Sequence, residues 1–263
     1  MSLVADASVQ RDMRHRFDVL RVLVGRDLKV VYKRSFLGLG WALGMPLVQL
    51  IVFSFVFRKV LEIEVEHYSV FVFVGVLVWG WFHSSLGDSV GLITSNRVLV
   101  GQPGFPLAVL PNVTVLVRLF HFLIALPLLV GMIFWSGLLP NVSWCFVPLL
   151  LIVQYLFTVG IAYPLASMNV IHRDTQHVTR VLLQLMMFLT PVFYSLDRVP
   201  EELQYWFQFN PMVGILDAWR SVLIKGTTPD LAVLGRLSVV GLVLLFLGRR
   251  LFVQQSHQFI EEL

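Results

Sequence analysis

One stretch of the chain, residues 184–226, constrains the fold more than any other. It begins as an apolar helix and breaks at Pro191, because proline lacks a backbone N–H and clashes with the preceding turn. A polar passage follows, then a group of aromatic residues, and then Asn210 and Pro211 open a second apolar piece. Neither piece after Pro200 has the ~20 residues needed to cross a bilayer. We therefore expect two short re-entrant helices that dip into one membrane face, where protein or a water-filled cavity must shelter the irregular backbone.

The composition indicates a polytopic membrane protein. Of 263 residues, 57% are hydrophobic and 14% are charged, and the mean hydropathy is +0.79. A soluble domain carries about 25% charged residues. The net charge of +4 comes from basic residues that cluster beside apolar runs, which favours lipid headgroups and topology control over nucleic acid. The one cysteine, Cys145, excludes an internal disulfide and a cysteine-based metal cluster.

Six apolar runs predict an all-α protein with six transmembrane helices. The runs cover residues 36–57, 69–93, 107–135, 144–168, 178–194 and 231–252. We divide the chain into a cytoplasmic N-terminal segment (1–35), a six-span domain (36–252, with the re-entrant helices in 195–226) and a cytoplasmic tail (253–263).

The N-terminal segment predicts an amphipathic helix on the membrane surface. Apolar residues recur there at spacings of three and four, which places them in one stripe: Phe17, Leu20, Val24, Leu28 and Val31. Basic residues occupy much of the remaining surface, as in helices that lie among anionic headgroups.

The distribution of positive charge predicts the orientation. Of the 20 Lys and Arg residues, 13 fall on the side of the N-terminus, six fall on the opposite side, and Arg118 lies within the third span. Cytoplasmic loops carry the excess of Lys and Arg, so both termini are predicted to be cytoplasmic.

Motifs for nucleotide binding and hydrolysis are absent from the sequence. It contains no G-x-x-x-x-G-K-[ST] phosphate-binding loop, no G-x-S-x-G and no H-E-x-x-H. A membrane-embedded transferase would need convergent acids, and the only close group, Glu62, Glu64 and Glu66, has the alternating spacing of a solvated loop. His83 or His121 could relay protons, but proton-driven transporters carry chains of such groups. An ion channel would need rings of acidic residues within the spans.

Two pairs of ionisable residues are predicted to be structural. Asp88 and Arg118 lie in adjacent spans, where charged groups tend to face inward and pair, although a substrate contact is the alternative. Asp217 and Arg220 are three apart on a helix and therefore share a face, where they are expected to fix the second short helix.

The aromatic residues of the broken stretch allow two interpretations. Tyr205, Trp206, Phe207 and Trp219 could form a belt at the membrane interface or a surface on which sugar rings stack. The sequence leaves both open.

Four segments, in order, resemble the ABC-2-type permeases that export polysaccharides such as O-antigen, capsule and teichoic acid. They are R-D-L-K-V-V-Y-K-R-S-F-L-G-L-G-W-A-L-G-M-P-L (26–47), N-R-V-L-V with F-P (96–106), N-V-I-H-R-D (169–174) and T-P-V-F-Y…V-P…F-N-P-M…R (190–220). The sequence departs from that pattern at 101–104, G-Q-P-G, where a lysine-containing segment is expected.

The resemblance implies a half-transporter of the bacterial inner membrane that forms a homodimer and recruits two copies of a separate ATPase. ATP and Mg²⁺ would bind to that ATPase, and this chain would hold no cofactor or metal. The cargo would be a polyprenyl-linked polysaccharide; a permease for a small lipid or drug is the alternative within the same class. The expected ATPase contacts are Ser95, Asn96, Arg97, Val98, Leu99 and Arg26.

The resemblance also implies a pore along the dimer interface, with the first and fifth spans beside it and the re-entrant helices as an outer gate. Basic residues of the N-terminal helix could attract the lipid phosphate: Arg26, Lys29, Lys33 and Arg34. The residues expected to form the pore and gate are Trp41, Pro191, Tyr194, Trp206, Asn210, Pro211 and Arg220.

Overall fold

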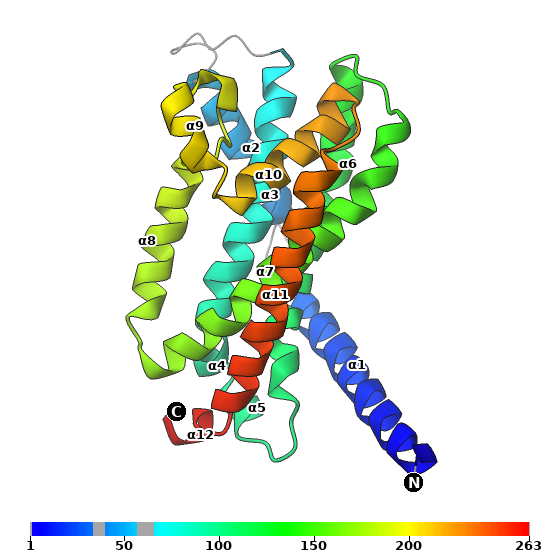
Figure 1. Ribbon diagram of the computed structural model, residues 1–263, viewed down its shortest axis with the longest axis vertical. Coiled ribbons are helices and arrows are strands. Elements are labelled where there is room, and N and C mark those ends of the chain that lie inside the picture. Colours follow the sequence, from blue (N-terminus) through cyan, green and yellow to red (C-terminus); the bar gives the residue numbers. More distant parts are fainter. Residues whose placement is uncertain (1, 34–39, 57–65, 263) are drawn as a thin grey trace.

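A computed structural model describes residues 2–33, 40–56 and 66–262, and all of its regular structure there is helical (Figure 1). The all-α prediction is therefore confirmed for this part of the chain. The helices are α1 (Ser2–Lys33), α2 (Gly40–Phe55), α3 (Tyr68–Val90), α4 (Leu92–Ser95), α5 (Arg97–Val100), α6 (Leu110–Trp135), α7 (Val147–Ile171), α8 (Thr175–Phe188), α9 (Glu201–Phe207), α10 (Pro211–Arg220), α11 (Leu231–Gln255) and α12 (Phe259–Glu262). The 3₁₀ turn η2 (Leu107–Val109) precedes α6, and the π-helical turn η5 (Ser221–Lys225) follows α10.

Four helices of the described chain are long and apolar enough to cross a membrane. They are Tyr68–Val90, Leu107–Trp135, Val142–Ile171 and Leu231–Gln255, at the positions of four predicted spans. The predicted first and fifth spans correspond to α2 and α8, with 16 and 14 residues. At 1.5 Å per residue, α8 covers about 21 Å of a hydrocarbon core about 30 Å thick. Six crossings therefore stay a prediction.

Helix α3 forms the centre of the bundle. It contacts α2, α6, α7, α8 and α10, and 72% of its span is buried. Its sequence is apolar on nearly every side, V-F-V-F-V-G-V-L-V, as expected for a helix with neighbours all round.

Helices α7 and α11 lie in backbone contact because glycines line their interface. A Cβ atom at Gly248 would lie 2.6 Å from the carbonyl oxygen of Gly160, and one at Gly160 would lie 2.8 Å from the Cβ of Leu244. Small residues allow this close approach, which is a main source of association between helices in lipid. The two helices therefore form one rigid pair.

Helix α1 extends away from the bundle, and its N-terminus lies at the free end (Figure 1). The predicted apolar stripe is divided: Leu20, Val24 and Leu28 pack against the core, whereas Phe17 is 64% exposed. The packed half contacts α6. The C-terminal part of the apolar stripe thus packs against the rest of the protein. That the exposed part of α1 lies on the membrane surface stays a prediction.

The two ends of the bundle differ. Helices α5 and α12 lie at one end, here called the α5 end, while α9 lies at the opposite end, here called the α9 end (Figure 1). The N-terminus points in the same direction as the α5 end, and α8 runs along one edge of the bundle (Figure 1).

Candidate functional site

The candidate site is the break after α8, where buried backbone leaves helical geometry. Helix α8 ends at Phe188, three residues before Pro191, so it stops slightly earlier than predicted. Thr190, Val192 and Phe193 are almost completely buried. Carbonyl groups that lose their helical partners inside a membrane must be satisfied by other groups. The carbonyl groups of the break must therefore accept hydrogen bonds from other parts of the chain.

Every carbonyl oxygen from residue 188 to residue 193 accepts a hydrogen bond. The donors are Tyr194 Oη to Phe188 O (2.6 Å), Asn210 Nδ2 to Leu189 O (3.2 Å), Val192 N to Thr190 O (2.6 Å), Arg220 Nη1 to Pro191 O (2.6 Å), Arg220 Nη2 to Val192 O (2.7 Å) and Tyr68 Oη to Phe193 O (2.9 Å). We call residues 188–194 together with Tyr68, Asn210 and Arg220 the joint. Side chains from α3 and α10 thus replace the missing helical hydrogen bonds.

Arg220 is the principal donor of the joint. Its side chain is 4% exposed, and its Cζ atom lies 3.4 Å from the centre of the Phe71 ring. The side chain thus places a positive charge inside the protein, beside an aromatic ring and the backbone carbonyl groups of the break. An arginine guanidinium keeps its charge inside proteins, and here it binds backbone dipoles.

The predicted partnership of Asp217 and Arg220 is wrong as an ion pair. Asp217 is exposed and accepts a hydrogen bond from Lys225 Nζ (3.2 Å), whereas Arg220 points inward to the break. A buried guanidinium needs several acceptors, and the break after α8 offers the carbonyl groups of Pro191 and Val192. The spacing of Asp217 and Arg220 along one helix could not predict this contact with a segment almost 30 residues earlier in the chain.

Gly75 of α3 provides the space for Arg220. A Cβ atom at this position would lie 2.6 Å from the Val192 carbonyl oxygen and 3.0 Å from Arg220 Nη2. The roles of Gly75 and Tyr68 are not visible in the sequence, because both residues contact segments more than 100 residues away in the chain.

Asn210 and Pro211 fix the start of α10. The Asn210 side chain caps the helix by accepting from Met212 N (3.1 Å), and its Nδ2 donates to Thr190 Oγ1 (2.9 Å). Pro211 occupies the first helical turn, where the missing N–H costs nothing. One residue therefore caps α10 and ties it to the joint.

Other contacts hold the remaining face of α10. Trp219 is completely buried, and its Nε1 donates to Gln154 Oε1 (3.1 Å) in α7, whose Nε2 donates to Val78 O (2.9 Å) in α3. Beyond α10, Gly226 adopts a left-handed conformation (φ 67°), and its carbonyl accepts from Asn141 Nδ2 (2.9 Å). Helix α10 is thus anchored on several sides.

Helix α9 has no buried residue. Tyr205, Trp206 and Phe209 are 59–68% exposed and contact one another, with ring centres 5.2–6.2 Å apart. The predicted gate residue Trp206 therefore lies in an exposed aromatic cluster at the α9 end. Trp219, which the sequence placed in the same aromatic group, is instead completely buried in α10.

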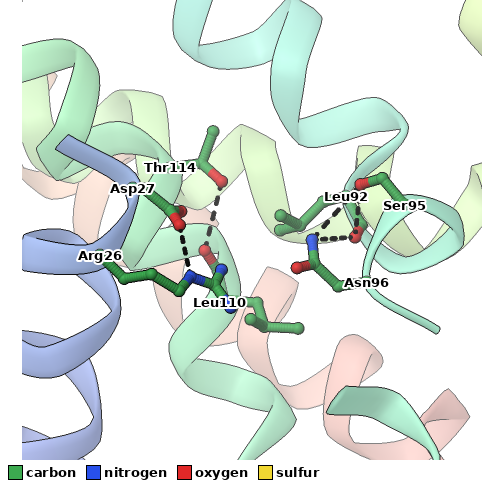
Figure 2. A network of polar contacts seen from close by, with 7 residues as sticks. All are labelled: Arg26, Asp27, Leu92, Ser95, Asn96, Leu110 and Thr114. Carbon is green, nitrogen blue, oxygen red and sulfur yellow. Dashed lines mark hydrogen bonds and ion pairs between the residues drawn. The ribbon is translucent and has the colours of Figure 1, made fainter. Parts of the chain in front are cut away.

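The predicted ATPase-contact loop lies at the α5 end. Figure 2 shows Arg26 and Asp27 of α1 on one side of the start of α6, and Leu92, Ser95 and Asn96 on the other. Asn96 Nδ2 donates to Leu92 O (2.9 Å) and so shapes the turn between α4 and α5. Val98 is 80% exposed, Arg97 is exposed and Leu99 is partly buried. This loop therefore presents a free apolar tip.

A partly buried network of hydrogen bonds connects the start of α6 to α7. Tyr163 Oη donates to Ala108 O (2.7 Å), Asn112 Nδ2 donates to Tyr163 Oη (2.7 Å), and Tyr155 Oη donates to Asn112 Oδ1 (2.9 Å). Ala108 follows the α4–α5 loop by only a few residues, so the network fixes the base of that loop. This network could not be recognised from the sequence, because single tyrosines in apolar spans resemble ordinary core residues.

The remaining predicted residues have different environments. Arg118 Nε donates to Asp88 (2.5 Å), so an ion pair joins α6 to α3 at the predicted place. Arg26 forms an ion pair with its neighbour Asp27 (2.8 Å), and Lys29 is exposed. Arg34 lies outside the described residues, as do the side chains of Lys33 and Trp41. Within the described chain, no three His, Cys, Asp or Glu side chains gather as a possible metal site.

Comparison with known proteins gives consistent results. The family model described as ABC-2 type transporter matches residues 18–224. The O-antigen export system permease protein RfbA of Myxococcus xanthus is 32% identical over 255 residues, covering 96% of this chain and 98% of the relative. RfbA of Klebsiella pneumoniae is 30% identical over 251 residues (95% and 96%). The polysialic acid transport protein KpsM of Escherichia coli is 24% identical over 248 residues (91% and 95%).

Proposed function

Because this chain belongs to the ABC-2 type transporter family, we propose that it is the membrane-spanning half of an exporter that carries lipid-linked polysaccharide out of the cytoplasm. The observation that carries the proposal is the similarity to O-antigen export permeases along nearly the whole chain. The sequence has no phosphate-binding loop, so ATP and Mg²⁺ are assigned to two copies of a separate ATPase.

In the proposed topology the chain crosses the bacterial inner membrane six times, with α2 and α8 completing the four long spans. Both termini and the α5 end are then cytoplasmic, α9 and α10 are re-entrant helices of an outer gate, and the exposed half of α1 lies on the inner membrane surface. Cys145 is exposed in the α6–α7 turn and is the only cysteine of the chain. The side of the membrane from which a thiol reagent reaches it therefore tests the proposed orientation. A membrane-impermeant maleimide should label it from outside the cytoplasm; labelling only after the inner membrane is opened would reverse the topology.

The homodimer is proposed to form along α8 and α2. Only Thr175, Thr179 and Leu183 of α8 are buried, and contacts join this helix to α3 and α7. Its opposite face exposes Val178, Val181, Leu182, Leu185 and Phe188, each by 53–60%. An exposed apolar face of this size on the edge of a bundle indicates an interaction surface. Its partner can be a second copy of the chain or a polysaccharide that slides past it.

The ATPase is proposed to bind the α4–α5 loop, with Arg26 at the edge of the contact. Val98 at the tip suits insertion into a groove of the partner, and Ser95, Asn96, Arg97 and Leu99 surround it. Closure of the ATPase on ATP would push on this loop, and the Tyr163 network would pass the displacement to α7 and α11 as a rigid pair.

The cargo is proposed to enter at the basic part of α1 and to leave at the α9 end. Arg26, Lys29, Lys33 and Arg34 would attract the phosphate of the polyprenyl carrier. Trp41, Tyr194 and the exposed Trp206 would offer ring stacking that does not depend on sugar sequence. Pro191, Asn210, Pro211 and Arg220 would hold the gate helices in place through the joint.

The decisive experiment is reconstitution of this chain with its ATPase in lipid vesicles. Lipid-linked glycan should stimulate ATP hydrolysis several-fold, and the ATPase alone should show no such response. Stimulation by short-chain lipids or drugs, with none from lipid-linked glycan, would instead identify a small-molecule permease.

A further inference from the structure

The short helix α12 folds back onto the bundle after α11. Gln258 N donates to Gln255 O (2.9 Å) and Glu262 N donates to Gln258 O (3.1 Å), so the chain turns directly after the end of α11. Helix α12 contacts α7 and lies at the α5 end (Figure 1). Its four residues include Phe259, which is completely buried. An isolated helix of this length is not stable in water, so burial of Phe259 holds α12 in place.

A row of three aromatic rings connects α12 to α7. The ring centres of Phe259 and Phe252 lie 5.2 Å apart, and those of Phe252 and Tyr163 lie 5.4 Å apart, with an angle of 70° between the rings in both pairs. Edge-to-face pairs of this kind are a favoured geometry for aromatic rings. All three residues are at most 2% exposed. Because protein interiors are close-packed, removal of one ring leaves a space into which its neighbour can tilt.

The last ring of the row is the principal donor to η2. Tyr163 Oη donates to Ala108 O (2.7 Å) and accepts from Asn112 Nδ2 (2.7 Å), which also reaches Ala108 O (3.2 Å). Ala108 is the central residue of η2, the turn between the α4–α5 loop and α6. The orientation of the Tyr163 ring therefore decides whether its hydroxyl group reaches the Ala108 carbonyl group.

The α4–α5 loop depends on η2 for its position. Residues 101–104, which join the loop to η2, are all exposed, and Val98 at the tip is 80% exposed. A segment with few buried contacts is displaced at a low free-energy cost. The hydrogen bonds of Ala108 therefore limit movement at this end of the loop.

We propose that α12 positions the loop that binds the ATPase. Phe259 holds Phe252 and Tyr163 in their packed orientation, and the Tyr163 hydroxyl group holds η2 and with it the α4–α5 loop. Phe259 is thus a positioning residue that acts through Tyr163. The role of the loop as the ATPase contact rests on the proposed function; the effect of α12 on the loop concerns this chain alone.

The test measures backbone hydrogen exchange in the purified full-length chain, together with its melting temperature. The variants are Phe259→Ala, Phe259→Leu, Tyr163→Phe and the double variant with Phe259→Ala and Tyr163→Phe. The matched control is Phe73→Ala, which removes an equally buried ring from α3. Phe73 lies between Phe71 and Gly75, which contact the joint, and so belongs to a different part of the bundle.

Phe259→Ala should raise exchange in residues 97–112 roughly 10-fold, and Phe259→Leu, which keeps most of the apolar volume, should raise it about 2-fold. Phe73→Ala should lower the melting temperature without this selective increase. Tyr163→Phe should raise exchange in the same residues, and Phe259→Ala should add little in that background, because the hydroxyl group through which it acts is already absent. No selective increase, or fully additive effects of the two substitutions, would overturn the proposal. If Phe259→Ala does not fold, Phe259→Leu and Tyr163→Phe provide the same comparison.

A second measurement reconstitutes each variant with the ATPase and records ATP hydrolysis stimulated by lipid-linked glycan. Phe259→Ala should lose at least about half of the stimulation, since the loop no longer holds one position against the ATPase. A loosened loop with full stimulation would overturn the proposal. Absence of stimulation in the native chain would instead refute the proposed function, while the exchange measurement would still decide whether α12 positions the loop.

Discussion

The two short helices between α8 and α11 differ sharply although they are adjacent in sequence. Seven of the ten residues of α10 are buried, whereas none of the seven residues of α9 is. Helix α10 and its N-cap Asn210 donate hydrogen bonds to the break through Arg220 and Asn210, and to α7 through Trp219. Helix α9 presents its aromatic rings to the surroundings.

This difference assigns separate tasks to the two halves of the proposed gate. A helix with many buried contacts keeps its place, while one with exposed contacts has a low free energy of local displacement. Residues 208–210 connect them, so α9 can move about this connection while α10 stays with the bundle. The substitutions below test this division, from the largest expected effect to the smallest.

Replacement of Arg220 by Leu should have the largest effect. It removes the donors to Pro191 O and Val192 O and leaves buried carbonyl groups unsatisfied, at a cost of roughly 3–5 kcal/mol. Melting temperature and monodispersity in detergent should both fall. R220K, which keeps the charge but loses the fork, should be intermediate, and the exposed R236L should behave like the native chain. Native-like stability of R220L would show that the joint does not hold α10.

Gly75→Ala should destabilise the same joint from the side of α3. The new Cβ atom would meet the Val192 carbonyl oxygen at 2.6 Å, and displacement of backbone costs about 1–3 kcal/mol. Gly80→Ala is the matched control, since nothing lies within 4 Å of its Cβ position. Unfolding in mixed detergent should separate the two variants clearly. Equal stability of the two would contradict the close approach of α3 to the break.

Gln154→Leu should have a smaller effect, because it removes one connection of α10 among several. The indole N–H of Trp219 loses its acceptor, which costs about 1 kcal/mol for an interhelical bond in a membrane protein. A double-mutant cycle with Trp219→Phe measures the pair itself. A coupling energy near zero would mean that the two side chains do not share a hydrogen bond in the membrane.

Trp206→Ala should change the stability least, by less than about 0.5 kcal/mol, since the ring is 68% exposed. Under the proposed function it should nonetheless reduce export of glycan. The same substitution at the buried Trp219 provides the contrast, with an expected loss of about 3–5 kcal/mol. A Trp206→Ala chain that unfolds as readily as Trp219→Ala would abolish the distinction between the two helices.

Local chemistry in the sequence was sufficient to predict an all-helical chain, its four long spans and the break after α8. Apolar runs of adequate length marked the four long spans, and Pro191 marked the break because it cannot continue a helix. Asn210 before Pro211 marked the start of α10. All of these signals involve neighbours within one or two turns of helix.

Contacts between distant segments could not be predicted in the same way. The sequence predicted a partnership of Arg220 with Asp217 because the two share a helix, yet Arg220 binds the break after α8 and the ring of Phe71. Gly75 and Tyr68 gain their roles only when α3 is placed beside the break. Such roles depend on packing, which a single sequence does not specify.

The chemistry of the joint has a consequence for its response to acid. Its acceptors are backbone carbonyl groups, and its donors besides Arg220 are hydroxyl and amide groups that stay neutral from pH 4 to pH 8. The Arg220 guanidinium keeps its proton throughout this range, because arginine is not deprotonated in proteins. Acidification on either side of the membrane therefore leaves the hydrogen bonds of the joint intact. In the proposed gate, opening of this contact would therefore require displacement of the surrounding helices rather than a change of protonation.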